Sequence, residues 1–266
     1  MMAGFPIWYE LMTPDPAKVA PFYRAVTGWT ISPEGNIMPN GAEYRMIHRA
    51  NGGHEGGVLS LTPAMMEGGA QPGWIAYFHV PDVDAALPRA EALGATVWMG
   101  AQSVPGAGRM AMLADPQGAP FYIMTPAPPP DKVDLTSDVF DAKKPGHCRW
   151  MQLDTIDAPA ANTFYTALFD WKTDQTMPMG PAGDYRFIEF DGVQIGAFNP
   201  MIPQGQKPAW LLFFGVEDID TAKSAAQAHG GTVTQDIHQV PSRDFIFMAR
   251  DPAGAAVAFV GPRKGA

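Results

Sequence analysis

The chain has 266 residues, 46% of them hydrophobic and 17% charged, which is enough apolar side chain for packed cores and excludes a disordered protein. The formal net charge of −9 repels nucleic-acid phosphates, so we expect no nucleic-acid partner. A single cysteine, Cys148, excludes an internal disulfide, and we expect it to be a small buried residue. Met1 to Pro6 lack the pattern of a signal peptide, and the longest apolar runs are strand-sized. We therefore expect a cytoplasmic protein that does not bind membranes.

The first predicted elements are a strand over Ile7–Met12 and a helix that opens at Asp15-Pro16. An aspartate before a helix and a proline at its first position are favoured at helix N-termini. The helix carries one apolar stripe for packing on a sheet, and it ends at Gly28. The stripe consists of Val19, Phe22, Tyr23 and Val26. Two strands bounded by glycines follow, over Tyr44–Arg49 and Gly57–Leu61.

The same order of elements then restarts. A strand over Trp74–Val80 leads to a helix that opens at Asp82 and closes at Gly94. The remaining strands are predicted over Thr96–Met99, Arg109–Ala114 and Pro120–Thr125. Between the last two, Asp115-Pro-Gln-Gly118 has the composition of a hairpin turn. The first half is therefore predicted to be β-α-β-β-β twice over.

The second half repeats the first. Trp8 recurs as Trp150, and further matched pairs follow in the same order. These pairs are Phe22-Tyr23 with Phe164-Tyr165, Trp74 with Trp210, and Asp115-Pro116 with Asp251-Pro252. The three prolines within Ala127–Asp131 cannot join a helix and make a stiff spacer. We therefore predict two domains, 1–126 and 146–263, joined by a proline-rich linker at 127–145.

These motifs resemble the vicinal oxygen chelate superfamily of glyoxalases, bleomycin-resistance proteins, fosfomycin-resistance enzymes and extradiol dioxygenases. The resemblance rests on the Phe22-Tyr23 helix that ends in Gly28-Trp29, the helix start after Val80, and the Asp115 hairpin, each present in both halves. The tandem arrangement looks like two-domain bacterial proteins labelled glyoxalases or hydroxylases. The resemblance implies an α+β fold with two tandem glyoxalase-like domains. Each domain would be a pair of βαβββ modules that forms an incomplete barrel around a cleft.

The resemblance also implies where metal ligands would lie, and the residues there are unsuitable. The first-half positions are Trp8, Ile75 and Tyr122, and the second-half positions are Trp150, Leu211 and Ala258. The strand around Gly57–Leu61 also lacks the remaining glutamate. Indole, aliphatic and methyl groups do not coordinate Zn²⁺, Ni²⁺ or Fe²⁺. We therefore expect neither a metal nor another cofactor.

Strand alternation predicts which side chains would line the clefts instead. If Trp8 faces the first cleft, then Glu10 and Met12 do too. The predicted catalytic residues are Glu10, His79 and Tyr122, and the predicted ligand-binding residues are Trp8, Met12, Tyr77, Met124, Trp150 and Gln152. A glutamate and a histidine in an apolar pocket suit general acid–base catalysis, because each shifts the pKa of the other towards neutrality. The structural alternative is a solvated His79 at a strand end and a Glu10 paired with a basic residue.

Other polar residues favour structural interpretations. His48, Arg49, His54 and Glu55 surround a Gly-Gly turn, where a solvated loop is the favoured interpretation. His147 has no partner pattern and is predicted to lie at the surface. The second-half counterparts of the acid–base residues are Gln152, Phe213, Gly215 and Ala258, with a single orienting amide. We therefore expect the first-half cleft to bind the ligand.

The sequence thus predicts a glyoxalase-like protein that binds a small organic molecule, aromatic or carbonyl-bearing, without a metal. It leaves open whether the protein is a lyase or isomerase that uses Glu10 and His79, or a sequestering protein of the bleomycin-resistance kind. A third alternative is a metal-dependent glyoxalase or dioxygenase with ligands from atypical positions such as Glu10, His48, His54 or His79. A homodimer is also left open.

Overall fold

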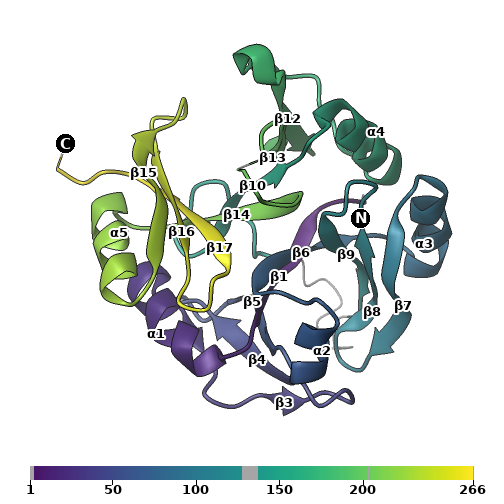
Figure 1. Cartoon of the computed structure of the whole chain (residues 1–266), viewed down its shortest axis with the longest axis horizontal. Helices are drawn as coiled ribbons and strands as arrows, with labels where there is room; N and C mark the ends of the chain where they lie inside the picture. Colours follow the sequence, from purple (N-terminus) through teal and green to yellow (C-terminus); the bar gives the residue numbers. More distant parts are fainter. Residues whose placement is uncertain (1–2, 128–136, 203, 266) are drawn as a thin grey trace. The chain divides into compact units, whose positions relative to one another are not determined.

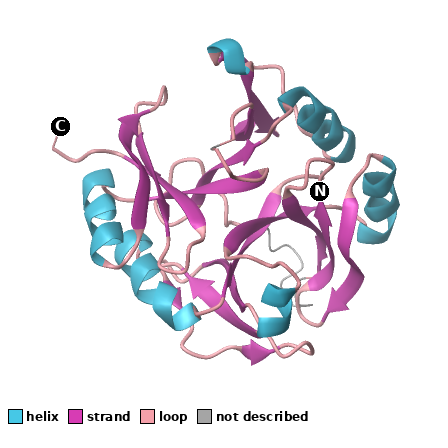
Figure 2. Cartoon of the chain, in the orientation of Figure 1, coloured by secondary structure: helices cyan, strands magenta, loops and turns pink. Residues whose placement is uncertain are grey.

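The computed structural model describes residues 3–127, 137–202 and 204–265, so residues 128–136 of the predicted linker lie outside the described residues. Strands dominate and are accompanied by a few helices (Figure 2). None of the helices in the described ranges is long and apolar enough to span a bilayer. The α+β class predicted from the sequence is confirmed.

The described residues of the first half form nine strands and three helices. They are β1 (Pro6–Thr13), α1 (Pro16–Thr27), β2 (Thr30–Ile31), β3 (Asn36–Ile37), β4 (Glu43–His48), β5 (His54–Ser60), α2 (Pro63–Glu67), β6 (Gly73–His79), α3 (Val83–Ala92), β7 (Thr96–Val104), β8 (Gly108–Ala114) and β9 (Pro120–Pro126). Every predicted strand and helix is present. The structure adds β2, β3 and α2, and extends β7 by five residues beyond the predicted end at Met99.

The second half repeats the order of the main elements, and its described residues contain no counterpart of α2. Its elements are β10 (Cys148–Asp154), α4 (Ala158–Leu168), β11 (Thr176–Pro178), a short 3-10 turn (Gly180–Ala182), β12 (Asp184–Phe190), β13 (Val193–Asn199), β14 (Ala209–Gly215), α5 (Ile219–Ala228), β15 (Thr232–Gln239), β16 (Phe245–Arg250) and β17 (Ala256–Gly261).

The helices begin where the sequence places their caps. The carboxylate of Asp15 accepts a hydrogen bond from the backbone N–H of Lys18, and Pro16 occupies the first helical position. Gly28 ends α1 with a φ of 76°, a left-handed conformation that glycine adopts without strain. Asp82 caps α3 in the same way through the N–H groups of Asp84 and Ala85.

The described chain divides into two compact units, and each takes residues from both halves of the sequence. Unit 1 is drawn from Met1–Ile7, Ile75–Ser137 and Met151–Trp210. Unit 2 is drawn from Trp8–Trp74, Asp138–Trp150 and Leu211–Ala266. The chain passes between the units within β1, β6, β10 and β14, and once more between Ser137 and Asp138. The bounds 1–126 and 146–263 follow the sequence repeat and stay a prediction.

Unit 2 contains two sets of hydrogen-bonded strands with helices packed against them. One set has the order β2-β4-β5-β1 with β3 beside β4, and the other has the order β14-β17-β16-β15. The neighbours β1 and β5 are parallel, and Glu10 is in register with Gly57. Helices α1 and α5, which come from different halves of the sequence, lie side by side (Figure 1).

Unit 1 is built from the other strands. Its orders are β6-β9-β8-β7 and β10-β13-β12-β11, with β6 parallel to β9 and β10 parallel to β13. Arg89 of α3 donates a hydrogen bond to the carbonyl of Ala167 in α4 at 2.9 Å. None of these strand orders returns to its first strand in the described residues, so the sheets are open and are not closed barrels.

Hydrogen bonds in the cores explain the repeated motifs. In unit 2, the indole N–H of Trp74 donates to the Tyr23 hydroxyl at 2.9 Å, and that hydroxyl donates to Asp251 at 3.0 Å. The equivalent residues of unit 1 form the same chain, from Trp210 to Tyr165 at 3.1 Å and from Tyr165 to Asp115 at 3.2 Å. These buried groups satisfy one another, which gives the repeated tyrosine, tryptophan and hairpin aspartate a structural role.

Candidate functional site

Three predicted site residues share one face of the sheet in unit 2. Trp8, Glu10 and Met12 alternate along β1, so their side chains point the same way. The Trp8 indole N–H donates to the Tyr44 hydroxyl at 2.7 Å, which places Tyr44 of β4 on that face. A Cβ at Gly57 of β5 would clash with the Tyr44 ring, so the absence of a side chain there lets the ring lie over the strand.

The same face combines a carboxylate with aromatic and thioether groups. Glu10 is 2% exposed, whereas Trp8, Met12, Tyr44 and Met46 are half-buried. Met46 is in register with Gly57, which is itself in register with Glu10. Mostly apolar walls around a few polar groups are typical of small-molecule sites.

One of two paired histidines lies beside Trp8. The rings of His48 and His54 meet edge to face with centroids 4.8 Å apart, and the His54 ring lies 6.5 Å from that of Trp8. The hydroxyl of Ser32 is 3.2 Å from Nε2 of His48. His54 is exposed, as the loop interpretation predicts, and it extends the aromatic surface next to Trp8.

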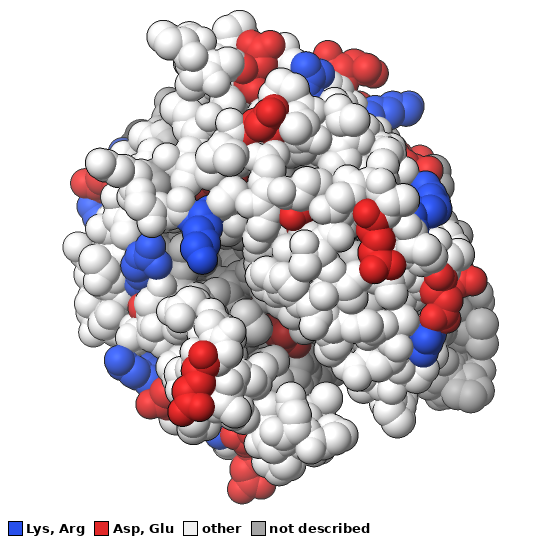
Figure 3. Space-filling model, turned by 45° about the vertical axis from the view of Figure 1, so that its right-hand side comes forward, with Lys and Arg blue, Asp and Glu red and all other residues white. Residues whose placement is uncertain are grey.

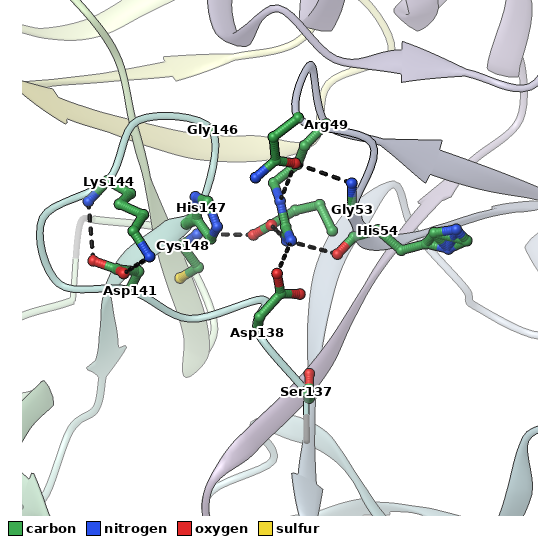
Figure 4. A network of polar contacts seen from close by, with 12 residues as sticks. Arg49, Gly53, His54, Ser137, Asp138, Asp141, Lys144, Gly146, His147 and Cys148 are labelled. Carbon is green, nitrogen blue, oxygen red and sulfur yellow. Dashed lines mark hydrogen bonds and ion pairs between the residues drawn. The ribbon is translucent and has the colours of Figure 1, made fainter. Parts of the chain in front are cut away.

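The interpretation of Arg49 and Glu55 as solvated loop residues is wrong. Their side chains are 2% and 0% exposed, and they form an ion pair at 2.8 Å. Arg49 also donates to the carbonyl of His54 and pairs with Asp138, and Glu55 accepts a hydrogen bond from the backbone N–H of Cys148 at 2.8 Å (Figure 4). Burial raises the pKa of Glu55, whereas Arg49 acts in the opposite direction. Through Asp138 and Cys148, this cluster holds residues 138–148 against the turn after β4.

Two further residues of that segment are buried. Cys148 is fully buried, as expected, and burial raises the pKa of its thiol, so the reactive thiolate is disfavoured. His147, predicted at the surface, is 4% exposed, and its Nδ1 lies 3.0 Å from the carbonyl of Pro145. Residues 138–148, which we call the strap, are held by Arg49 and Glu55, and this explains why His147 is buried and not at the surface.

Four predicted residues share a face in unit 1. Tyr77 is in register with Tyr122, and His79 is in register with Met124, so the predicted parity of β6 and β9 is confirmed. The two tyrosine rings stack with centroids 4.0 Å apart and planes 9° apart. His79 is 6% exposed, so the alternative of a solvated strand end is wrong. Since Glu10 belongs to unit 2, its pairing with His79 stays a prediction.

The second-half residues have different surroundings. Trp150 packs in unit 2 against a buried apolar cluster that includes Leu211, Phe213 and Ala258. Gln152, in unit 1, accepts a hydrogen bond from the Tyr185 hydroxyl at 2.9 Å. Asp154, two residues after Gln152 and therefore on the same face, was not among the predicted site residues. Strand alternation from Gln152 was the available signal.

The family metal positions do not fit a metal. Trp8 uses its N–H in a hydrogen bond, the Tyr122 ring is stacked on Tyr77, and Leu211 and Ala258 lie within an apolar cluster. Across the described residues, no group of three or more His, Cys, Asp or Glu side chains is placed to hold a metal ion. The donors that Zn²⁺ or Fe²⁺ requires are thus not assembled there.

We therefore expect the purified protein to carry less than one-tenth of an equivalent of Zn, Ni, Mn or Fe. Its melting temperature should be unchanged in excess EDTA, because no folding free energy comes from a bound ion. Elemental analysis and thermal unfolding with and without chelator test this. About one equivalent of tightly held metal, with a lower melting temperature after its removal, would contradict the expectation.

The face drawn in Figure 3 has no patch of one charge sign that would indicate a further binding site. Acidic and basic side chains are interspersed there, and broad areas carry neither. Many surface carboxylates pair with a neighbouring base, for example Asp84 with Arg109 and Asp220 with Arg263. That nucleic acid is not a partner stays a prediction from the net charge.

Comparisons with known proteins agree with this architecture. Residues 8–124 match the family model of the glyoxalase-like domain, and residues 145–259 match that of the glyoxalase/bleomycin resistance protein/dioxygenase superfamily. A Mycobacterium tuberculosis protein with glyoxylase in its name, CFP32, is 27% identical over 260 residues, which cover 97% of this chain and 95% of the relative. The anthracycline biosynthesis protein DnrV of Streptomyces peucetius is 28% identical over 279 residues, covering 98% and 94%.

Solved structures show the same fold at lower identity. The Mn(II)-bound glyoxalase from Novosphingobium aromaticivorans superposes with a TM-score of 0.66 at 14% identity, covering 98% of this chain and 82% of that structure. The 2,3-dioxygenase LapB from Pseudomonas sp. KL28 superposes with a TM-score of 0.63 at 16% identity, covering 99% and 94%. At these identities the likeness shows the fold alone.

Proposed function

Since this chain belongs to the glyoxalase/bleomycin resistance protein/dioxygenase superfamily, we propose that it binds a small planar organic molecule beside Glu10 without a metal ion. The proposed reaction is of the isomerase or lyase type, with Glu10 as the group that moves a proton. The observation that carries the proposal is the buried Glu10 carboxylate on the sheet face that Trp8 and Tyr44 share.

The side chains favour an aromatic or carbonyl-bearing ligand. Trp8 and Tyr44 are linked by a hydrogen bond and half-buried, so their rings offer a fixed surface for stacking. Met12 and Met46 beside them are adaptable apolar contacts. The name of DnrV connects that relative with anthracyclines, which are planar aromatic carbonyl compounds, and this supports the same ligand class.

The proposed step needs only one carboxylate. Glu10 takes the proton from the hydroxyl-bearing carbon next to the ligand carbonyl, and the C–H electron pair moves into an enediolate. The protonated Glu10 then returns the proton to the same carbon, which gives exchange, or to the former carbonyl carbon while the hydroxyl proton passes to the former carbonyl oxygen, which gives isomerisation; no electrons are gained or lost. A positioned general base typically contributes a factor of about 10²–10⁴ to such a rate.

Phenacyl alcohol is a suitable probe, because it is an aromatic α-hydroxyketone with exchangeable C–H bonds beside its carbonyl. We expect the wild-type chain to bind it in calorimetry and to catalyse the exchange of its methylene protons in D₂O, followed by proton NMR. Glu10→Gln should slow the exchange at least about 100-fold with little change in affinity. Trp8→Ala should weaken binding. Glu34→Gln, at an exposed carboxylate of the same unit, is the matched control and should match wild type.

Each other result contradicts a defined part of the proposal. Binding without exchange in the wild type would remove the catalytic role and identify a sequestering protein. Exchange that survives Glu10→Gln would assign the proton transfer to another group. Binding that is lost on Trp150→Ala but kept in Trp8→Ala would place the ligand in the second half. No binding at millimolar probe would overturn the proposal itself.

A further inference from the structure

A second polar cluster lies in unit 1, on the face of β10, β12 and β13 that carries Gln152. The Tyr185 hydroxyl donates to Oε1 of Gln152 at 2.9 Å, and Nε2 of Gln152 donates to Oδ1 of Asp154 at 2.6 Å. Nδ2 of Asn199 donates to the same Asp154 oxygen at 2.8 Å. Asp154 is in register with Asn199 across the parallel pair β10 and β13, so both side chains rise from one row of the sheet.

Two oxygen atoms of this cluster, Asp154 Oδ2 and Asn199 Oδ1, accept no hydrogen bond from the described residues. Asp154 Oδ1 accepts two hydrogen bonds, whereas Oδ2 accepts none from the described residues. Asn199 is 8% exposed, and its Oδ1 is buried without a hydrogen-bond partner in the described part of the chain. Its amide nitrogen is already used by Asp154 and by the carbonyl of Met201. A buried acceptor without a partner destabilises a fold, so the retention of Asn199 Oδ1 beside the open Asp154 oxygen favours a ligand that donates hydrogen bonds.

The internal repeat shows that the fold does not require these polar residues. Met12 occupies the position of Asp154 in the first half, and Met12 is in register with Leu59, as Asp154 is with Asn199. The same parallel strand pair therefore forms with two apolar side chains. An acid and an amide at these positions have a role other than the formation of the sheet.

The surroundings of the cluster are aromatic and carry no compensating positive charge. Phe187 and Tyr185 are half-buried, and their rings meet edge to face with centroids 5.5 Å apart. Phe187 is in register with Ala197, which is in register with Gln152, so the Phe187 ring rises on the same face as the cluster. Across the described residues, no lysine, arginine or histidine forms an ion pair with Asp154. Burial raises the pKa of Asp154, opposed by its hydrogen bonds from Asn199 and Gln152.

We propose that this face is a second ligand site, in which Asp154 and Asn199 bind the ammonium group of an aliphatic amine that carries an aromatic ring. The N–H groups of the amine donate to Oδ2 of Asp154 and to Oδ1 of Asn199, and its ring packs against Phe187 and Tyr185. A cation is favoured over a neutral donor, because a charge-assisted hydrogen bond to a partly buried carboxylate is about twice as strong as a neutral one. An anion is disfavoured, because the open groups are acceptors.

The test uses 2-phenylethylamine as the probe and the full chain labelled with ¹⁵N. The side-chain amide signals of Gln152 and Asn199 report on the site and are assigned with Gln152→Ala and Asn199→Ala. We expect saturable shifts of these signals with the amine. The neutral 2-phenylethanol should bind at least about 10-fold more weakly, and the anionic 3-phenylpropanoate should not bind. Asp154→Asn, nearly isosteric, should weaken amine binding at least about 10-fold.

Two further variants separate binding from folding. Asp184→Asn removes an exposed carboxylate at the start of β12 and should leave amine binding unchanged. Phe187→Leu keeps the polar cluster but removes the aromatic contact, and it should weaken the amine while the amide signals stay dispersed. The proposal is overturned if the amine and the alcohol bind alike, if Asp154→Asn binds like wild type, or if the Gln152 and Asn199 signals do not respond.

Discussion

Replacing Glu55 by alanine is expected to lower the free energy of unfolding by about 3–5 kcal/mol, the usual cost of removing one partner of a buried ion pair. The side chain of Glu55 is fully buried and pairs with Arg49, and it accepts the N–H of Cys148. Its removal leaves a buried guanidinium with less compensating charge and a buried amide with no acceptor. Urea unfolding followed by tryptophan fluorescence measures the change.

Two variants make this result interpretable. Glu55→Gln keeps an oxygen that accepts the Cys148 N–H, so its loss should be smaller than that of Glu55→Ala. Asp84→Ala breaks the exposed ion pair with Arg109 and should leave the urea midpoint unchanged. If Glu55→Ala were as stable as Asp84→Ala, the buried cluster would not hold the strap of residues 138–148 in place.

Trp29→Ala is expected to cost about 3–5 kcal/mol of unfolding free energy, since truncating a buried aromatic leaves a large cavity. Trp29 is fully buried, its ring lies 4.7 Å from that of Phe214, and its N–H donates to the carbonyl of Gly146 at 2.8 Å. Its counterpart Trp171 is 5% exposed and donates to the carbonyl of Gly4 at 2.9 Å. Trp171→Ala should therefore show a loss of the same size.

Trp98→Ala is the matched control, because that indole on β7 is 54% exposed. Its unfolding free energy should stay within about 0.5 kcal/mol of wild type, as for most surface substitutions. Thermal or urea unfolding of the three variants under one set of conditions provides the comparison. A Trp29→Ala loss no larger than that of Trp98→Ala would show that the repeated tryptophans are not core supports.

Most of the helices and strands can be predicted from the sequence, because the patterns that indicate them are local. The Asp15 and Asp82 caps, the left-handed Gly28 and the alternating strands each depend on residues a few positions apart. The short elements β2, β3 and α2 were missed because runs of two to five residues have no measurable period. Which segments make up each compact unit could not be predicted either. A repeat shows that two modules have the same fold, but it does not show which modules pack together.

In the candidate site too, features that depend on local patterns were predicted, and features that depend on long-range contacts were not. Parity along β1, β6 and β9 predicts which side chains share a face, and the register of β6 with β9 confirms it for Tyr77 and Tyr122. Arg49 and Glu55 were misread because their partners, Asp138 and Cys148, are 89 and 93 residues away in the sequence. A polar turn and a buried ion pair have the same local composition, so only tertiary structure distinguishes them.

The interleaved composition of the units has a consequence for how the chain folds during synthesis. Unit 1 can be completed once residue 210 has left the ribosome, whereas unit 2 must wait for residues 211–266. Tyr23 meets its hydrogen-bond partner Asp251 across 228 residues, so the contact order of unit 2 is high and its closure is entropically slow. Until then the apolar stripe of α1 has no α5 to pack against. The nascent chain therefore carries α1 without part of its final packing partners through most of its elongation, and incompletely packed apolar surface is prone to aggregation.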